Sequence, residues 1–297
     1  MTRRAARLAV PALAALLLFG VDAMTQAAEK NDVPPDSILP EGKWTLTFED
    51  DFEGPGRSPD GTEGNERGDD LDETVWESTD AEYLPGHIES SRHRRNVVVE
   101  EGMMRLVTRR EKTTDPETGK VYQWTAGHIW TRQFQQEFGY FEAKIRIAGA
   151  SGQNNAFWLS PYNPANGALE LDITEAHYPS ETTANLHDRI RKPKKFDSGF
   201  DYDTGKNLAE DFHIYGLEWT PDVVRWYFDG KVVREYKAGP DFATRKQRIP
   251  MVIRFSTAQL PGKWDGQPQQ NPDGTWKLDG KSMDIDWVRA YKPAAEQ

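Results

Sequence analysis

The sequence contains no cysteine, so no disulfide can stabilise the fold and no lipoprotein anchor can be attached. Its 297 residues are nevertheless enough to bury one sizeable core. Basic residues are also in deficit, with 37 Lys and Arg against 48 Asp and Glu and a net charge of −11. This balance disfavours nucleic acid as a partner.

The sequence has no apolar run long enough to cross a bilayer. The longest run, residues 8–19, is about a dozen residues, whereas a membrane span needs about 20. It follows three arginines and precedes small residues at positions 25–27, the order typical of a secretory signal peptide. We therefore predict a signal peptide over residues 1–27 and a secreted or periplasmic product with no membrane contact after cleavage. The pair Arg3-Arg4 leaves twin-arginine export open.

The rest of the chain shows no internal repeat and no second domain. Residues 28–43 form a proline-rich N-terminal lead-in, and residues 44–293 are expected to form a single domain. We expect this domain to act as a monomer.

Sustained helical periodicity is nearly absent, and residues 242–248 are the one candidate for a helical turn or two. Short alternating segments bounded by Gly, Pro, Asn and Asp recur instead. The clearest region is 212–236, where turns at 220–222 and 229–230 separate three strands of an antiparallel meander. Roughly a dozen short strands predict an all-β fold of two packed antiparallel sheets, a β-sandwich or jelly roll.

Aromatic residues are plentiful, with ten Trp, ten Tyr and thirteen Phe. In an exported all-β chain, such a surplus indicates platforms that stack on sugar rings. Filling the core of a broad sandwich explains any single one of them equally well.

The most informative stretch is residues 170–175, which reads Glu-Leu-Asp-Ile-Thr-Glu. In a strand, Glu170 and Asp172 share one face while the aliphatic residues take the other. Strict alternation would turn Glu175 into the apolar layer, where an unpaired carboxylate costs several kcal/mol. A β-bulge at Ile173-Thr174 would return Glu175 to the acidic face, and bulges of this kind are found beside active sites.

With that bulge, the two glutamates lie about 13 Å apart at Cα, and their side chains can bring the carboxyl groups within about 5 Å. That is the separation of a retaining glycosidase. Because Asp172 lies between them, one pKa should rise, which supplies an acid and a nucleophile in one cluster. The same hexapeptide also fits a solvated acidic strand edge.

Taken in order, the chain resembles glycoside hydrolase family 16, a family of secreted endo-acting β-glycanases. The matching segments are residues 48–54, 96–106, 139–143, 156–158, 170–175, 212–230 and 286–289. The resemblance implies a concanavalin A-like jelly roll with a concave substrate-binding sheet. It also implies that Glu170 is the nucleophile, Glu175 the general acid and base, and Asp172 the residue that tunes the pair. The Glu-x-Asp-x-x-Glu spacing resembles members that cut laminarin, agar or carrageenan, although the Trp that usually precedes the motif in β-1,3-glucanases is missing from 163–169.

Further residues are candidates for binding the polysaccharide. They are Trp158, Asn155, His177, His187, Arg94 and Trp264. Arg94 belongs to a basic cluster at 92–95, and a second cluster lies at 189–195. Guanidinium groups suit sulfate or carboxylate recognition, but solvated loop charge is the simpler interpretation and the one we prefer. The sequence leaves open which polysaccharide is bound and whether it is sulfated.

The resemblance also implies a structural Ca²⁺ held by Asp51, the Gly102 carbonyl and Asp286, with no cofactor needed for catalysis. Oxygen-only ligands suit this ion. Two other classes remain open: a lectin-like sugar-binding protein without catalysis, and a metal site built from the motif acids with His177 and His187. Hydrolysis and transglycosylation differ only in the acceptor, which the sequence leaves open.

Overall fold

The chain divides into two units, residues 1–31 and 32–297, and the computed structural model describes the second. The described residues are 33–65, 67–163, 169–188, 196–239 and 250–294. The predicted signal peptide, the helical candidate at 242–248 and the second basic cluster at 189–195 lie outside them. Within the described residues, no helix has the length and apolar character to cross a membrane.

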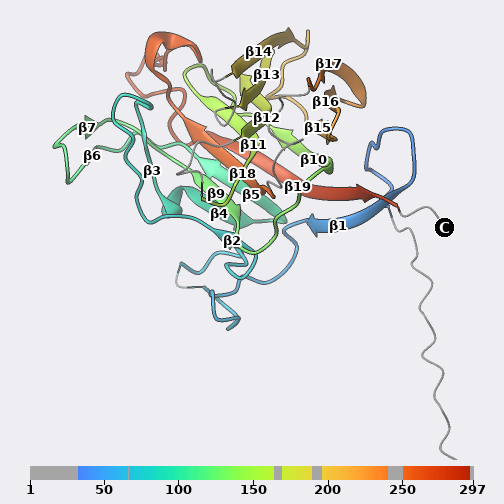
Figure 1. Cartoon of the computed structure of the whole chain (residues 1–297). Helices are drawn as coiled ribbons and strands as arrows, with labels where there is room; N and C mark the ends of the chain where they lie inside the picture. Colours follow the sequence, from blue (N-terminus) through green and yellow to red (C-terminus); the bar gives the residue numbers. More distant parts are fainter. Residues whose placement is uncertain (1–32, 66, 164–168, 189–195, 240–249, 295–297) are drawn as a thin grey trace, which may run out of the picture. The chain divides into compact units, whose positions relative to one another are not determined.

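The first sheet has eight strands, all antiparallel, in the order β17-β16-β15-β10-β19-β5-β4, with β1 also paired to β19 (Figure 1). Its strands are β1 (Trp44–Asp50), β4 (Val97–Glu100), β5 (Met103–Val107), β10 (Gly139–Arg146), β15 (His213–Trp219), β16 (Val223–Phe228), β17 (Lys231–Lys237) and β19 (Ser282–Pro293).

The second sheet has seven antiparallel strands in the order β14-β13-β12-β11-β18-β9-β2. Its strands are β2 (Trp76–Glu77), β9 (His128–Thr131), β11 (Asn154–Ser160), β12 (Leu169–His177), β13 (Glu181–Asp188), β14 (Phe196–Asp203) and β18 (Val252–Ala258). The remaining elements are short: β3 (Ser91–Arg92), β6 (Thr113–Thr114), β7 (Val121–Tyr122), β8 (Thr125–Ala126) and the 3₁₀ turns η1 (Arg94–Asn96) and η3 (Pro261–Lys263).

The two large sheets pack face to face around one main apolar cluster. Leu171, Phe157 and Phe255 of the second sheet meet Trp226 and Phe141 of the first, and all five are fully buried. Side chains alternate between the two faces of a strand, so the polar residues of each sheet lie on the face opposite this cluster. The prediction of an all-β sandwich of two antiparallel sheets is confirmed.

The predicted meander at 212–236 is confirmed as β15, β16 and β17. The turn between the last two strands has positive φ at both Asp229 (45°) and Gly230 (77°), which is the geometry of a tight hairpin turn. An Asp-Gly pair meets this requirement at little steric cost, so the local sequence sets the register of the hairpin.

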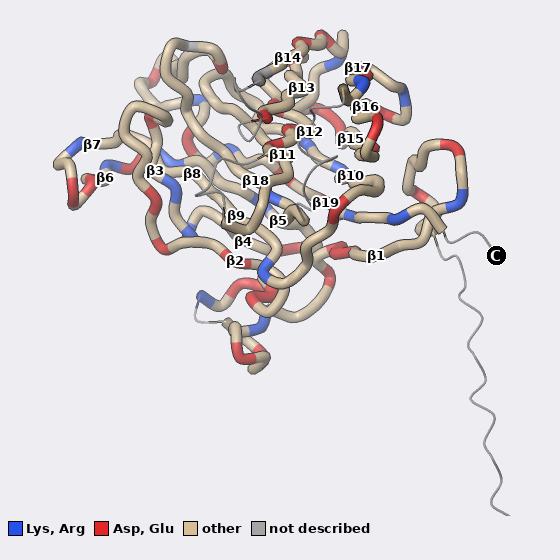
Figure 2. The backbone as a smooth tube through the Cα atoms, in the orientation of Figure 1, with Lys and Arg blue, Asp and Glu red and all other residues tan. Residues whose placement is uncertain are grey.

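Charged residues are spread along both sheets and the connecting loops (Figure 2). Many of them pair with opposite charges close in the chain, as in Arg57 with Asp72 at 2.8 Å and Arg225 with Glu235 at 2.7 Å. Exposed pairs of this kind contribute little to stability individually.

Candidate active site

Strand β12 carries the acidic motif in the middle of the second sheet, between β11 and β13. Against β11, Phe157 lies opposite Thr174 and Trp158 opposite Asp172, so Ile173 is an extra residue. This confirms the predicted bulge at Ile173-Thr174.

The same shift is seen against β13. Asp172 pairs with Asn185 and Glu175 pairs with Thr183, which leaves Ile173 and Thr174 opposite a single residue. Thr174 is buried, where its hydroxyl bonds that of Thr182. The bulge therefore places Glu170, Asp172 and Glu175 together on the face turned away from the core, called the outer face below.

His187 of β13 joins two of these acids. It lies directly opposite Glu170 in the strand register, with Nε2 3.2 Å from Oδ2 of Asp172 and 3.8 Å from Oε1 of Glu170. One ligating atom from each of the three residues falls within 4.8 Å of the others. His187 is one of the residues predicted to bind polysaccharide, and the structure places it beside the motif in contact with the acids.

Glu175 has a different environment from Glu170. The side-chain amide of Asn154 donates to its Oε1 at 2.7 Å, and that of Asn185 donates to its Oε2. Burial raises the pKa of Glu175 to about 8, and the negative charge of Asp172 adds to this effect. Glu175 is therefore protonated at neutral pH, as a general acid must be.

A cluster of aromatic and cationic side chains lies beside Asp172 on the outer face. The indole N–H of Trp158 donates to Oγ of Ser256 at 3.1 Å, and the ring of His128 stacks on it at 5.7 Å. The Arg254 guanidinium lies 5.1 Å from the Trp130 ring centroid and 5.2 Å from that of Trp158. Of this cluster, the sequence analysis named only Trp158. The alternation of side chains within 128–131 and 252–258 would also have placed His128, Trp130 and Arg254 on this face.

Asn155, predicted to bind substrate, does not reach the outer face. It is 1% exposed, with Nδ2 donating to the Ala176 carbonyl at 3.0 Å and Oδ1 accepting from the Ala148 N–H at 3.2 Å. Strand alternation turns it inward with Phe157 and turns its neighbour Asn154 toward Glu175.

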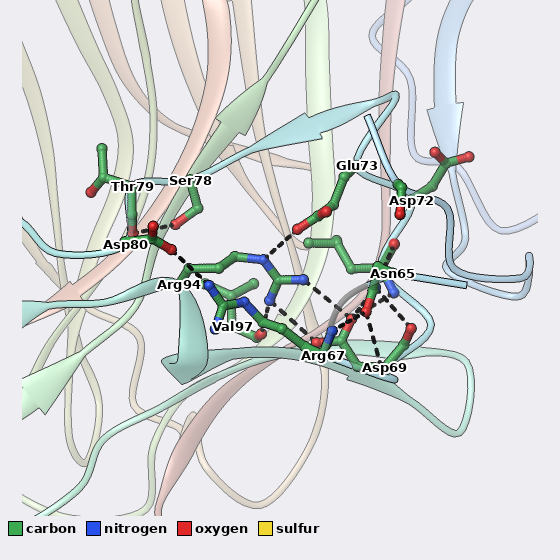
Figure 3. A network of polar contacts seen from close by, with 12 residues as sticks. Asn65, Arg67, Asp69, Asp72, Glu73, Ser78, Thr79, Asp80, Arg94 and Val97 are labelled. Carbon is green, nitrogen blue, oxygen red and sulfur yellow. Dashed lines mark hydrogen bonds and ion pairs between the residues drawn. The ribbon is translucent and has the colours of Figure 1, made fainter. Parts of the chain in front are cut away.

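Arg94 of η1, another residue predicted to bind substrate, is also buried. It is 3% exposed, with Nε donating to Oε1 of Glu73 at 2.9 Å and a second nitrogen donating to the Val97 carbonyl at 2.6 Å. The same guanidinium pairs with Asp69 at 3.2 Å (Figure 3). These bonds hold the loop before β2 against η1.

His177 lies two residues beyond Glu175 and is 5% exposed. Its ring meets that of Trp264 edge to face at 4.3 Å, and Trp264 is 44% exposed. Burial lowers the pKa of His177 to about 4, so the imidazole is neutral at pH 7. Of the five residues of the predicted metal set, the structure groups the ligating atoms of Glu170, Asp172 and His187 within 4.8 Å of one another.

The three predicted calcium positions lie at the ends of β1 and β5 and in the stretch of β19 that neither of these strands pairs with. β5 pairs with residues 282–285 of β19 and β1 with residues 288–293, both along the edge opposite β10. Asp286 lies in the gap between these two pairings, Asp51 directly follows β1, and Gly102 directly precedes β5. Lys144 already donates to Oδ2 of Asp286 at 2.7 Å, so a bound ion would share that carboxylate.

The model of the β-porphyranase A–D GH16 domain matches residues 50–293. The chain belongs to glycoside hydrolase family 16. This match confirms the resemblance drawn from the motifs. Because the family consists of glycosidases, the motif acids are candidates for its catalytic carboxyl groups.

Glucan endo-1,3-beta-glucosidase A1 of Niallia circulans is 26% identical over 214 residues, which is 66% of this chain and 31% of that protein. Endo-1,3-1,4-beta-glycanase ExsH of Rhizobium meliloti (strain 1021) is 29% identical over 180 residues, 59% of this chain and 35% of that protein.

The chain thus spans about a third of the length of these curated relatives. Among solved structures, porphyranase B from Zobellia galactanivorans superposes with a TM-score of 0.65 at 21% identity, covering 89% of this chain and 97% of that one. The endo-beta-1,3-glucanase from Pyrococcus furiosus gives 0.68 at 22% identity, covering 89% and 100%. At these identities the structural likeness concerns the fold, and it agrees with the jelly roll that the family implies.

Proposed function

We propose that this family 16 member is a retaining, endo-acting glycoside hydrolase that cleaves a β-linked polysaccharide by double displacement. The observation that carries the proposal is the geometry of the bulged strand, which places Glu175 on the same face as Glu170, Asp172 and His187. Burial raises the pKa of Glu175. A carboxylic acid beside a second carboxylate is the pair that retaining hydrolysis requires.

In the first step, a carboxylate oxygen of Glu170 attacks the anomeric carbon while Glu175 gives its proton to the departing glycosidic oxygen. In the second step, Glu175, now ionised, takes a proton from water, and the water oxygen displaces Glu170 from the anomeric carbon. Burial raises the pKa of Glu175 in the free enzyme, and the negative charge of Asp172 adds to this effect. His187 contacts both Asp172 and Glu170 and restricts their orientation.

The substrate we favour is a porphyran-type galactan. The β-porphyranase domain model covers the chain from residue 50 to 293, whereas the glucanase relatives align over 66% of the chain or less. β-1,3-Glucan is the second candidate because several curated relatives are named as glucanases.

The test is a reducing-end assay on laminarin, mixed-linkage glucan, agarose, porphyran and carrageenans, with wild type beside Glu170→Gln and Glu175→Gln. We expect cleavage of porphyran, its loss in Glu170→Gln and a fall of about 10²- to 10⁴-fold in Glu175→Gln. Binding without cleavage of any polymer by the wild type would instead favour the lectin-like class.

Azide separates the roles of the two glutamates. In Glu170→Gly, azide can occupy the place of the missing carboxylate and displace the leaving group, giving the inverted glycosyl azide. In Glu175→Ala, azide can attack the glycosyl-enzyme without a general base and gives the retained product. The opposite pairing of products would reverse the assignment. Product analysis with a sugar acceptor present measures the share of transglycosylation.

Three further proposals concern the whole protein. Residues 1–27 direct export, which the N-terminal sequence of the mature protein would test. The mature chain is a monomer, which its mass in solution would test. A Ca²⁺ bound by Asp51, Gly102 and Asp286 stabilises the gap beside β19 and takes no part in the cleavage chemistry.

A further inference from the structure

We propose that Gly199 and Arg234 are positioning residues for Glu175, both acting through the side-chain amide of Asn185; this inference rests on the glycanase function proposed above. Gly199 belongs to β14 and Arg234 to β17, an edge strand of each sheet. Asn185 lies on β13 and donates to Oε2 of Glu175. Gly199 leaves room for this amide, and Arg234 holds the backbone beside it.

Gly199 provides the space that the Asn185 side chain occupies. The two residues lie opposite each other in the register of β13 and β14. A Cβ atom on residue 199 would lie 2.6 Å from Oδ1 of Asn185, whereas the Thr183 methyl carbon, the next residue in contact, is 4.0 Å away. Residue 199 does not have positive φ, so the backbone itself accepts an alanine. The atom that an alanine would meet is the end of a flexible side chain, so the amide would move and the strand would stay in place.

Arg234 holds the backbone next to Asn185 from the core side. Its guanidinium donates to the carbonyl of Ala184, the residue before Asn185. It also donates to the carbonyl of Ser198, the residue before Gly199, at 3.1 Å, and a second nitrogen donates to Oγ of Ser198. A planar guanidinium bonds several acceptors at once in a fixed geometry. These bonds therefore clamp β13 to β14 where Asn185 meets Gly199.

The bulge in β12 explains why a clamp is needed at this place. A bulge interrupts the hydrogen-bond ladder locally, and Ala184 is the single residue of β13 that lies opposite it. On β12, the carbonyl of Asp172 accepts from the indole N–H of Trp226 at 2.8 Å. The Arg234 guanidinium lies 4.5 Å from the centroid of the same Trp226 ring. Donors from the first sheet thus bond carbonyl groups on both strands at the bulge.

Two amides orient the carboxyl group of Glu175, one on each oxygen. Asn154 donates to Oε1 at 2.7 Å, and Asn185 donates to Oε2. A general acid acts only within hydrogen-bond reach of the oxygen that it protonates, so a carboxyl group that is free to rotate slows the chemical step. The rest of the cleft still binds substrate, so the loss is expected in kcat and not in KM.

Gly199→Ala is the decisive variant. We expect kcat to fall about tenfold at neutral pH while KM stays within about twofold. The Tm should not fall, because alanine loses less backbone entropy than glycine on folding and displaces only the end of a side chain. Gly54→Ala, at an exposed glycine with open space around the added Cβ, is the matched control. An unchanged kcat in Gly199→Ala would refute the positioning role.

A double-mutant cycle tests whether the effect passes through Asn185. Asn185→Ala alone should lower kcat about 10- to 100-fold, and adding Gly199→Ala to it should change kcat by less than about twofold. Effects that multiply in the double variant would refute the route through Asn185.

Arg234 is tested in the same cycle. Arg234→Met should lower kcat about tenfold alone and less than about twofold in the Asn185→Ala background. Arg234→Lys keeps the charge and a donor without the planar fork, so it should lose only about threefold, and it tests the clamp even if Arg234→Met does not fold. A wild-type kcat in Arg234→Lys, or effects that multiply with Asn185→Ala, would refute the role of Arg234.

The side-chain amide of Asn185 reports its contact with Glu175 without any substrate. Its ¹H and ¹⁵N nuclear magnetic resonance signals, identified by their absence from Asn185→Ala, should shift when Glu175→Gln replaces the carboxyl group. In Gly199→Ala the same replacement should leave these signals nearly unchanged, because the amide no longer touches residue 175. Equal shifts in both backgrounds would refute the positioning role. A wild type that cleaves no polymer would refute the proposed function, and the amide signals would then decide the positioning role by themselves.

Discussion

Asn154 and Glu175 are joined by a hydrogen bond of 2.7 Å from the amide nitrogen of one to Oε1 of the other. The bond links neighbouring strands β11 and β12, because Asn155 lies opposite Ala176 in their register. It favours the ionised form of Glu175, whereas burial and Asp172 favour the protonated form. The balance of these effects sets the pH at which the acid gives up its proton.

The first prediction concerns the pH dependence of the wild type. Glu175 acts as an acid only while protonated, so kcat/KM should hold through neutral pH and fall above about pH 8. The measurement is initial rates on the cleaved polymer from pH 4 to 10, with stability checked at each pH. An alkaline limb centred near pH 5 would contradict the assignment of Glu175.

Replacing Asn154 with Leu removes the bond that favours the carboxylate. The pKa of Glu175 should therefore rise further, and the alkaline limb should move to higher pH. The rate at neutral pH should fall about 10- to 100-fold, because the carboxyl group loses one of its two positioning amides. Asn155→Ala is unsuitable as a control since Asn155 holds the core-side backbone. Gln270→Leu serves instead.

Stability should also depend on Glu175. Its folded pKa of about 8 lies above the ordinary value of 4.5, so the folded state binds this proton more tightly than the unfolded state. The resulting stabilisation is complete below pH 4.5 and is lost as the pH rises through about 8. Glu175→Gln cannot ionise, so it should become progressively more stable than wild type between pH 5 and 9. The measurement is the Tm of both proteins across that pH range. Parallel plots of Tm against pH would refute the raised pKa of Glu175.

Arg94→Ala should destabilise the fold by about 3–5 kcal/mol, because Asp69 and Glu73 would keep their charges in a partly buried site without a partner. Catalysis per folded molecule should be unchanged, since Arg94 contacts no residue of the acidic motif. Urea unfolding measures the loss of stability. The value of kcat, normalised to the concentration of folded active sites, measures catalysis separately. A normal stability with a raised KM would restore the role in binding that the sequence suggested.

If Ca²⁺ occupies the gap beside β19, removing it with a chelator should lower Tm and leave the pH profile of cleavage unchanged. Asp51→Asn should lower Tm in the same way and make it insensitive to the chelator. A Tm that does not respond to chelator or to added Ca²⁺ would argue against the ion. In that case the ion pair of Lys144 with Asp286 is sufficient to hold this part of the sheet.

The features predicted correctly from sequence are those set by local patterns. The bulge in β12 follows from three acids that must share one face, and the β16–β17 hairpin follows from its Asp-Gly turn. Both depend on residues within a few positions of each other.

The features missed depend on contacts between distant segments. Arg94 belongs to a basic cluster in sequence, but the pairing with Asp69 and Glu73 depends on how the loop before β2 folds back. Arg254 meets Trp130 and Trp158 only because β18 lies between β9 and β11. The choice between Asn154 and Asn155 required the strand register to within one residue, which no local pattern of this segment supplies.

The bulge in β12 also bears on how this strand can change over evolution. Removing Ile173 or Thr174 would leave Glu-x-Asp-x-Glu, and in an unbulged strand those three acids again share one face. A one-residue insertion or deletion at this point therefore leaves the order of the acids on the outer face intact, although it falls inside a central strand. Alignments that forbid gaps within strands would shift the catalytic acid by one position here and pair it with a core residue.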